Sequence, residues 1–106
     1  MVERLDGVFR ALSDPTRRAI IDRVAREEVA IGTLAGPLPM SFEAVSKHVR
    51  SLEQAGLVRR RRVGREHLIS LEARPLDEAH RWLDRYSRFW SDAFDTLDRT
   101  RHEETS

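Results

Sequence analysis

Cysteine is absent from all 106 residues of the chain. This excludes disulfide bonds, thiolate metal ligands and cysteine redox chemistry. Long apolar runs are also absent, because no stretch approaches the roughly 20 residues that cross a bilayer. The first ten residues, MVERLDGVFR, hold no apolar secretory segment. We therefore expect no membrane association and a cytoplasmic location.

The sequence also lacks the common catalytic motifs. Its five glycines form no phosphate-binding loop, and no HExxH metalloprotease motif occurs. Ser46 and His48 have no third residue with which to form a hydrolase triad. The sequence therefore indicates a protein that is not an enzyme and that carries no cofactor.

The chain is rich in charge, and the charge is unevenly distributed. Apolar residues make up 40% of the sequence and charged residues 35%, with a formal net charge of only +1. Residues 41–70, however, carry seven basic and three acidic side chains, whereas residues 71–106 carry six and nine. Positive charge concentrated on one segment is typical of polyanion binding. The length suits a single domain, expected over residues 1–100, with a disordered tail at 101–106.

Apolar spacing and capping residues predict about five helices. The strongest start signal is at Ser13 or Asp14 followed by Pro15, because Pro is favoured in the first helical position. A short third helix should end before the Gly36–Pro39 cluster. The predicted helices cover residues 1–12, 15 to about 27, 31–35, 42–55 and 76–97.

The fourth predicted helix combines a cap, an apolar stripe and a polar face. Ser41 is a favoured N-cap, and Gly56 is a favoured stop after the last turn. Val45, Val49 and Leu52 recur at helical spacing, so they should face the core.

A β-hairpin is predicted directly after this helix, from Leu57–Val63 and Glu66–Leu71, joined by a turn at Gly64 and Arg65. It carries five arginines: Arg59, Arg60, Arg61, Arg62 and Arg65. Successive strand residues point to opposite faces, so only about half of the four-arginine run can aim the same way.

A polar helix beside a basic hairpin predicts a mainly α fold with a small β-hairpin, the winged helix-turn-helix, which binds double-stranded DNA. A helix fits the major groove, while cations beside it neutralise phosphates. Two simpler interpretations stay open: a solvated surface, and a basic face that binds an acidic protein partner. The residues expected to contact DNA are Ser41, Phe42, Glu43, Ser46, Lys47, His48, Arg50, Arg60, Arg62 and Arg65.

The last predicted helix carries five of the seven aromatic residues, between Trp82 and Phe94. Its apolar positions repeat in steps of three and four, which favours pairing with another helix. We therefore expect a homodimer through the first and last helices. Burial against the chain's own core and a pocket for a hydrophobic effector are the alternatives. The residues expected at the dimer interface are Leu5, Val8, Phe9, Leu76, Ala79, Leu83, Tyr86, Trp90, Ala93 and Leu97.

Asp77, His80 and Asp84 share one face of the same helix and could ligate a metal ion. Zinc sites usually need several His or Cys ligands, so these residues are more typical of ordinary surface charge. We expect no metal site, and a metal-responsive repressor with a site on the last helix remains the alternative.

Three segments resemble the ArsR/SmtB family of bacterial winged-helix repressors: ALSDPTRRAII, AVSKHVRSLEQAGLV and RRRRVGREHLISL. The resemblance implies a homodimer that binds a palindromic operator and represses transcription, with Ser46, Lys47 and His48 at the DNA surface and Arg65 at the wing tip. Members that sense metals use cysteines on early helices or a His and carboxylate set on the last, which this chain does not reproduce. It looks more like the cysteine-free branch, often encoded beside START-like hydrophobic-ligand proteins. A small-molecule effector of unknown identity is thus a further expected partner.

Overall fold

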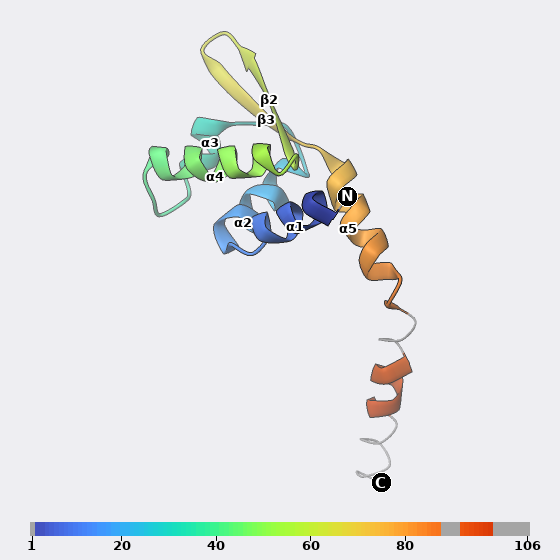
Figure 1. Ribbon diagram of the computed structural model, residues 1–106. Coiled ribbons are helices and arrows are strands. Elements are labelled where there is room, and N and C mark those ends of the chain that lie inside the picture. The colour runs from blue at the N-terminus through green and yellow to red at the C-terminus, as the bar shows by residue number, and fades with distance from the viewer. Residues whose placement is uncertain (1, 88–91, 99–106) are drawn as a thin grey trace.

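The computed structural model describes residues 2–87 and 92–98. The helices form a body together with one small sheet, and a hairpin of that sheet projects from the body (Figure 1). This arrangement confirms the mainly α fold with a wing. The elements are α1 (Val2–Ala11), α2 (Pro15–Val24), β1 (Val29–Ala30), α3 (Ile31–Ala35), α4 (Phe42–Gln54), β2 (Val58–Val63), β3 (Glu66–Leu71) and α5 (Ala73–Asp84), with a further helical segment at 92–98.

The sheet has three antiparallel strands in the order β1-β3-β2, one strand more than the hairpin predicted from the sequence. Ile69 on the central strand is paired with Val29 of β1 on one side and with Arg60 of β2 on the other. β1 has only two residues, too few for a visible alternation of apolar and polar positions. Its strand character comes from pairing with a segment about 40 residues away.

The core is entirely apolar among the residues that the structure describes. Val45, Val49 and Leu52 of α4 are completely buried, as predicted, and Leu57 and Ile69 are buried beside them. No polar or charged side chain in the described part of the chain is buried. The helices therefore hold their places mainly through apolar contact.

The two ends of α4 follow the predicted capping chemistry. The Ser41 hydroxyl oxygen accepts a hydrogen bond from the Ala44 amide at 3.1 Å. At the other end, Gly56 has a φ of 75°, and the amide of Leu57 donates to the carbonyl oxygen of Leu52 at 3.0 Å. This is the Schellman arrangement, which needs a left-handed residue after the C-cap. The helix therefore ends at Gln54, before the wing begins.

The last helix differs from the single helix predicted over residues 76–97. It begins at Ala73, so Pro75 lies inside its first turn, where no amide hydrogen is needed. It ends at Asp84, and Ser87 donates its hydroxyl hydrogen to the Asp84 carbonyl oxygen at 2.9 Å. A side chain that donates to this carbonyl oxygen competes with the backbone hydrogen bond that would continue the helix. Among the described residues, no helix has the length and apolar character to cross a membrane.

Two residues expected at a dimer interface belong to the core of the single chain. Val8 and Ala79 are buried where α1 packs against α5. Leu5 and Leu76 are partly buried and pack against the same core. The periodicity could not separate these positions from outward ones because both sides of α5 carry apolar residues. Trp90 and the tail expected at 101–106 lie outside the described residues.

We predict that Ile69→Ala destabilises the fold by about 2–5 kcal/mol, because it opens a cavity where the sheet meets the helices. The measurement is chemical denaturation followed by circular dichroism. Val63→Ala is the matched control on the same hairpin, since Val63 is exposed, and its free energy of unfolding should stay within about 0.5 kcal/mol of the wild-type value. Equal losses in both variants would contradict the core described above.

Candidate nucleic-acid interface

The inward stripe of α4 determines which side chains it presents to solvent. Because Val45, Val49 and Leu52 face the core, residues about half a helical turn away face outward. Glu43, Lys47 and Arg50 are all exposed in the outermost row. The outward face of the helix therefore carries one carboxylate and two cations.

The wing flank of α4 holds Phe42, Ser46 and Glu53, which follow one another at steps of about one and two helical turns. Glu53 marks this flank directly, because its carboxylate binds Arg60 of β2. The opposite flank carries His48, which approaches α2. The two flanks thus connect α4 to different parts of the molecule.

Strand alternation sorts the arginines of β2 into two sets. Arg60 and Arg62 are paired in register with Ile69 and His67 of β3, and Ile69 faces the core. Paired residues share a face of the sheet, so Arg60 and Arg62 lie on the face turned toward α4. Arg59 and Arg61 lie on the other face. The four arginines therefore divide equally between the two faces of the sheet, as predicted.

Three wing arginines are held by carboxylates at the base of the hairpin. Arg61 makes a bidentate contact with Glu28 at 2.8 and 2.6 Å. The remaining pairs join Arg59 to Glu72 at 3.0 Å and Arg60 to Glu53 at 2.7 Å. These pairs neutralise much of the charge that the sequence places on the hairpin.

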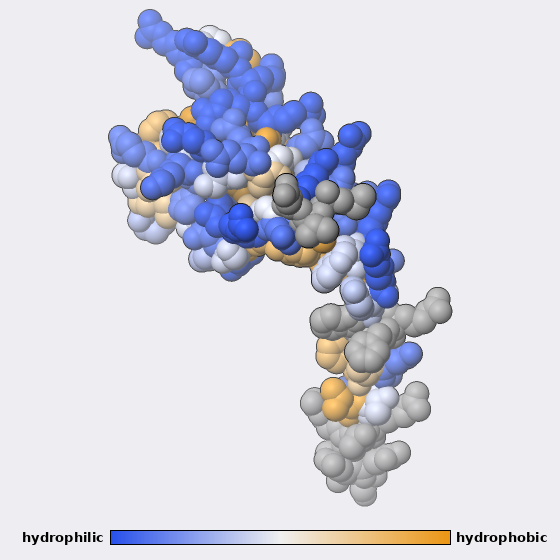
Figure 2. Space-filling model, viewed as in Figure 1, coloured by the Kyte–Doolittle hydropathy of each residue, from blue (hydrophilic) through white to orange (hydrophobic). Residues whose placement is uncertain are grey.

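The tip of the wing keeps its charge. Arg62 is exposed and donates to the carbonyl oxygen of Gly64, at 3.1 Å. Arg65 is exposed, and no acidic side chain in residues 2–87 or 92–98 pairs with it. Gly64 has a φ of 63°, which suits the first central position of a tight two-residue hairpin turn. Figure 2 shows a mostly hydrophilic surface on the projecting hairpin.

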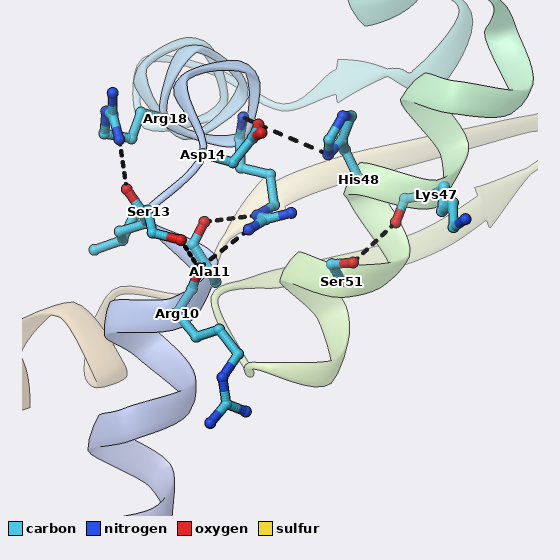
Figure 3. Close-up of polar contacts among 10 residues, drawn as sticks. Arg10, Ala11, Ser13, Asp14, Arg18, Lys47, His48 and Ser51 are labelled. Carbon is cyan, nitrogen blue, oxygen red and sulfur yellow. Dashed lines mark hydrogen bonds and ion pairs between the residues drawn. The ribbon is translucent and has the colours of Figure 1, made fainter.

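His48 is turned away from the outermost row of α4 and toward the start of α2 (Figure 3). Its Nδ1 lies 3.8 Å from a carboxylate oxygen of Asp14. That carboxylate caps α2 by accepting a hydrogen bond from the Arg17 amide at 3.0 Å. The same amide hydrogen bond, helped by the nearby imidazole of His48, holds the pKa of Asp14 below its ordinary value. His48 therefore links α4 to α2.

A pair of arginines fixes the junction between α1 and α2. Arg17 donates from Nε to the Ala11 carbonyl oxygen at 2.6 Å, and Arg18 donates to the Leu12 carbonyl oxygen at 2.8 Å. They satisfy carbonyl groups left free at the end of α1. The junction thereby fixes α1, and α5 packs on α1.

The structure brings most of the predicted DNA-contacting residues into one region of α4 and the wing. Ser41, Phe42, Glu43, Lys47 and Arg50 are exposed, and Ser46 is half-buried. Arg60 and His48 are instead engaged by carboxylates within the chain. The sequence analysis did not identify those carboxylates, Glu53 and Asp14, as partners, because only the fold brings them close. No group of three or more potential metal ligands occurs among the described residues.

Comparison with known proteins identifies the chain. The family model described as a helix-turn-helix domain matches residues 12–61. The chain is 41% identical over 88 residues to the HTH-type transcriptional regulator Rv2034 of Mycobacterium tuberculosis, covering 83% of this chain and 79% of that protein. It is 32% identical over 79 residues to the transcriptional repressor SdpR of Bacillus subtilis, covering 74% and 88%. A crystal structure of an ArsR family transcriptional regulator superposes with a TM-score of 0.79 at 34% identity, covering 86% and 94%.

The chain belongs to the ArsR/SmtB family. This ArsR/SmtB protein is a DNA-binding transcriptional regulator, and its α3, α4 and wing form the winged helix-turn-helix. The fold is also that of the homodimeric winged helix-turn-helix DNA-binding domain of Mb0332 from Mycobacterium bovis, with a TM-score of 0.64 at 22% identity over 92% of this chain and 85% of that one.

The Glu28–Arg61 pair yields a prediction about pH. The hydrogen bonds that the Glu28 carboxylate accepts from Arg61 hold the pKa of Glu28 below the ordinary value of 4.5. The pair therefore contributes stability above that value and loses it as the pH falls through the lowered pKa. In Arg61→Gln, an NMR titration of the Glu28 carboxyl carbon should give a pKa closer to 4.5.

Arg62→Gln is the control for this titration, because Arg62 is the next residue and binds no carboxylate in the described part of the chain. It should leave the pKa of Glu28 unchanged. The ion pair would be disproved if Glu28 titrated at the same pH in the wild type and in Arg61→Gln.

Proposed function

We propose that this ArsR/SmtB regulator is a homodimeric repressor that binds a palindromic operator through residues 41–50 of each α4 and through the wing tips. The observation that carries this proposal is the distribution of unneutralised cations. Lys47 and Arg50 on the outer row of α4, together with Arg62 and Arg65 at the wing tip, have no carboxylate partner in the described part of the chain. Phosphates would supply the missing negative charge.

The two groups of cations suit different parts of a duplex. α4 would enter the major groove, where Ser46 and Glu43 can reach base edges. The wing would follow the adjacent backbone, with Arg62 and Arg65 on phosphates. Two subunits related by a two-fold axis would then bind half-sites centred about one helical turn, roughly 34 Å, apart or a small multiple of it. A DNA-binding role would place the protein in the cytoplasm.

Repression is supported by the similarity to SdpR, which is named a transcriptional repressor. A bound dimer blocks transcription when its operator overlaps a promoter. Release would need a signal, and a small-molecule effector is proposed for this role because the chain has no cysteine to supply thiolate metal ligands.

Dimerisation is supported by the apolar surface of α1 and α5. The rings of Phe9, Trp82 and Tyr86 form a continuous edge-to-face row, with centroid distances of 5.8 and 5.3 Å. Leu83 lies beside them and is 47% exposed. Aromatic area of this extent is costly to leave in water. Leu97 and Phe94 of the segment 92–98 are also exposed, and Ala93 lies in the same exposed segment.

We predict that Lys47→Ala or Arg65→Ala weakens binding to all duplexes and reduces its salt dependence. Each phosphate contact contributes about 0.9 to the slope of log K against log salt, so a dimer that loses two contacts should lose about 1.8. The measurement is fluorescence anisotropy with a labelled duplex over a range of salt concentrations.

Arg61→Gln is the matched control, because it also removes one positive charge per chain but from an arginine that Glu28 already neutralises. Its slope should change less than those of Lys47→Ala and Arg65→Ala. Identical slopes in all three variants would mean that net charge alone governs binding and that the proposed face is wrong.

We predict that Leu83→Asp converts the dimer into a monomer, because it puts a carboxylate on the apolar face of α5. Sedimentation equilibrium should then give the chain mass of 12.3 kDa in place of twice that mass. Operator affinity should fall sharply, since each half-site loses the advantage of linked binding. Ala19→Asp is the control, because Ala19 is exposed on α2; this variant should remain dimeric. A dimeric Leu83→Asp would refute the proposed interface.

A further inference from the structure

Phe42 is an apolar residue in an otherwise polar surface. It is the first residue of α4, and its side chain is 50% exposed. It belongs neither to the buried core nor to the partly buried residues that pack on that core. About half of this residue therefore stays in contact with water, where an exposed ring is unfavourable.

The position of Phe42 points to DNA rather than to the dimer interface. Among the described residues, six exposed large hydrophobic side chains lie on α1, on α5, directly after α5 at Tyr86, and on segment 92–98. Only Phe42 and Val63 lie elsewhere, at the start of α4 and at the end of β2. Phe42 lines a hollow of about 340 Å³ between the start of α3 and the turn of the wing, where Arg65, Glu66 and His67 form the other wall.

The side chains in the first turn of α4 are better suited to base edges than to phosphates. Residues 41–44 hold no cation, and Glu43 is exposed without a cationic partner in the described part of the chain. A carboxylate repels phosphate oxygens, whereas it can accept a hydrogen bond from the amino group of cytosine. The cations of the helix come later, at Lys47 and Arg50. The first turn would therefore face the floor of the groove, with backbone contacts further along the helix.

Within the major groove, the C5-methyl group of thymine is the apolar feature that a side chain can recognise, and phenylalanine is one of the residues that contacts it. We infer that Phe42 is a specificity-determining residue that recognises the C5-methyl group of one thymine in each operator half-site. This inference rests on the proposed function and adds to it the chemical feature of the operator that this chain would recognise.

The size of the effect follows from the apolar contact of one methyl group. Burying such a group contributes about 0.8 kcal/mol, which corresponds to about fourfold in the dissociation constant. Two equivalent half-sites give about fifteenfold if the contributions add. A change of this size is well within reach of a binding titration.

The experiment begins with the selection of bound duplexes from a random DNA library by the full-length protein. Each thymine of the selected sequence is then replaced by deoxyuridine, which removes only the methyl group and keeps the base pair. We expect one symmetry-related pair of positions at which deoxyuridine weakens wild-type binding about fifteenfold. In Phe42→Ala the same replacement should change binding by less than about twofold.

Two controls separate base recognition from other roles of the ring. Val63→Ala removes a comparably exposed apolar side chain from the wing and should keep the wild-type discrimination between thymine and deoxyuridine. Thermal unfolding of Phe42→Ala should match the wild type, because the ring lies outside the core. A Phe42→Ala protein that stays folded and discriminates as the wild type does would overturn the inference.

The outcomes also separate this inference from the function on which it rests. If selection yields a bound sequence but no position distinguishes thymine from deoxyuridine, Phe42 does not recognise a methyl group and the repressor function stands. If Phe42→Ala weakens binding equally to every duplex, the ring contacts the backbone and the inference fails. If no duplex is enriched at all, the proposed function and the inference fail together.

Discussion

The complete burial of Val45, Val49 and Leu52 is the constraint on which the proposed DNA-binding surface depends. These three side chains fix the rotation of α4 about its own axis, because any rotation would expose one of them to water. The outer row of Glu43, Lys47 and Arg50 is therefore fixed as well, although those residues contribute no burial of their own. Since the core contains no polar group among the described residues, polar contacts at its edge refine this orientation and do not create it.

Carboxylates of the chain determine which arginines of the wing remain available to bind a ligand. Glu28, Glu53 and Glu72 each bind one arginine of β2, and exposed pairs of this kind add little stability. Their larger effect is geometric and electrostatic: they tie the base of the hairpin to the body and leave the positive charge at its tip. A wing charged along its whole length would bind any polyanion along either face of the sheet. Restricting the charge to Arg62 and Arg65 aligns it with the recognition helix.

Much of this structure could be predicted from local patterns. The apolar stripe, Ser41 and Gly56 were enough to define α4 to within a residue or two, and Gly64 located the turn of the wing. What escaped prediction depends on contacts between distant segments. β1 is a strand only because β3 lies beside it, and Glu28 neutralises Arg61 from 33 positions away. Val8 and Ala79 could not be assigned to the core from periodicity, since α1 and α5 each bear more apolar residues than one face can bury.

The exposed apolar residues complete this picture, because their distribution separates two kinds of recognition. Around α5 they form a broad, continuous surface of aromatic rings, which suits another apolar protein surface. At the start of α4 a single ring stands among polar groups, and an isolated ring cannot hold two proteins together. A small apolar feature surrounded by hydrogen-bonding groups is what thymine presents in the major groove. In the proposed complex, exposed apolar residues would therefore serve assembly around α5 and sequence recognition at the start of α4, and their surroundings would determine which.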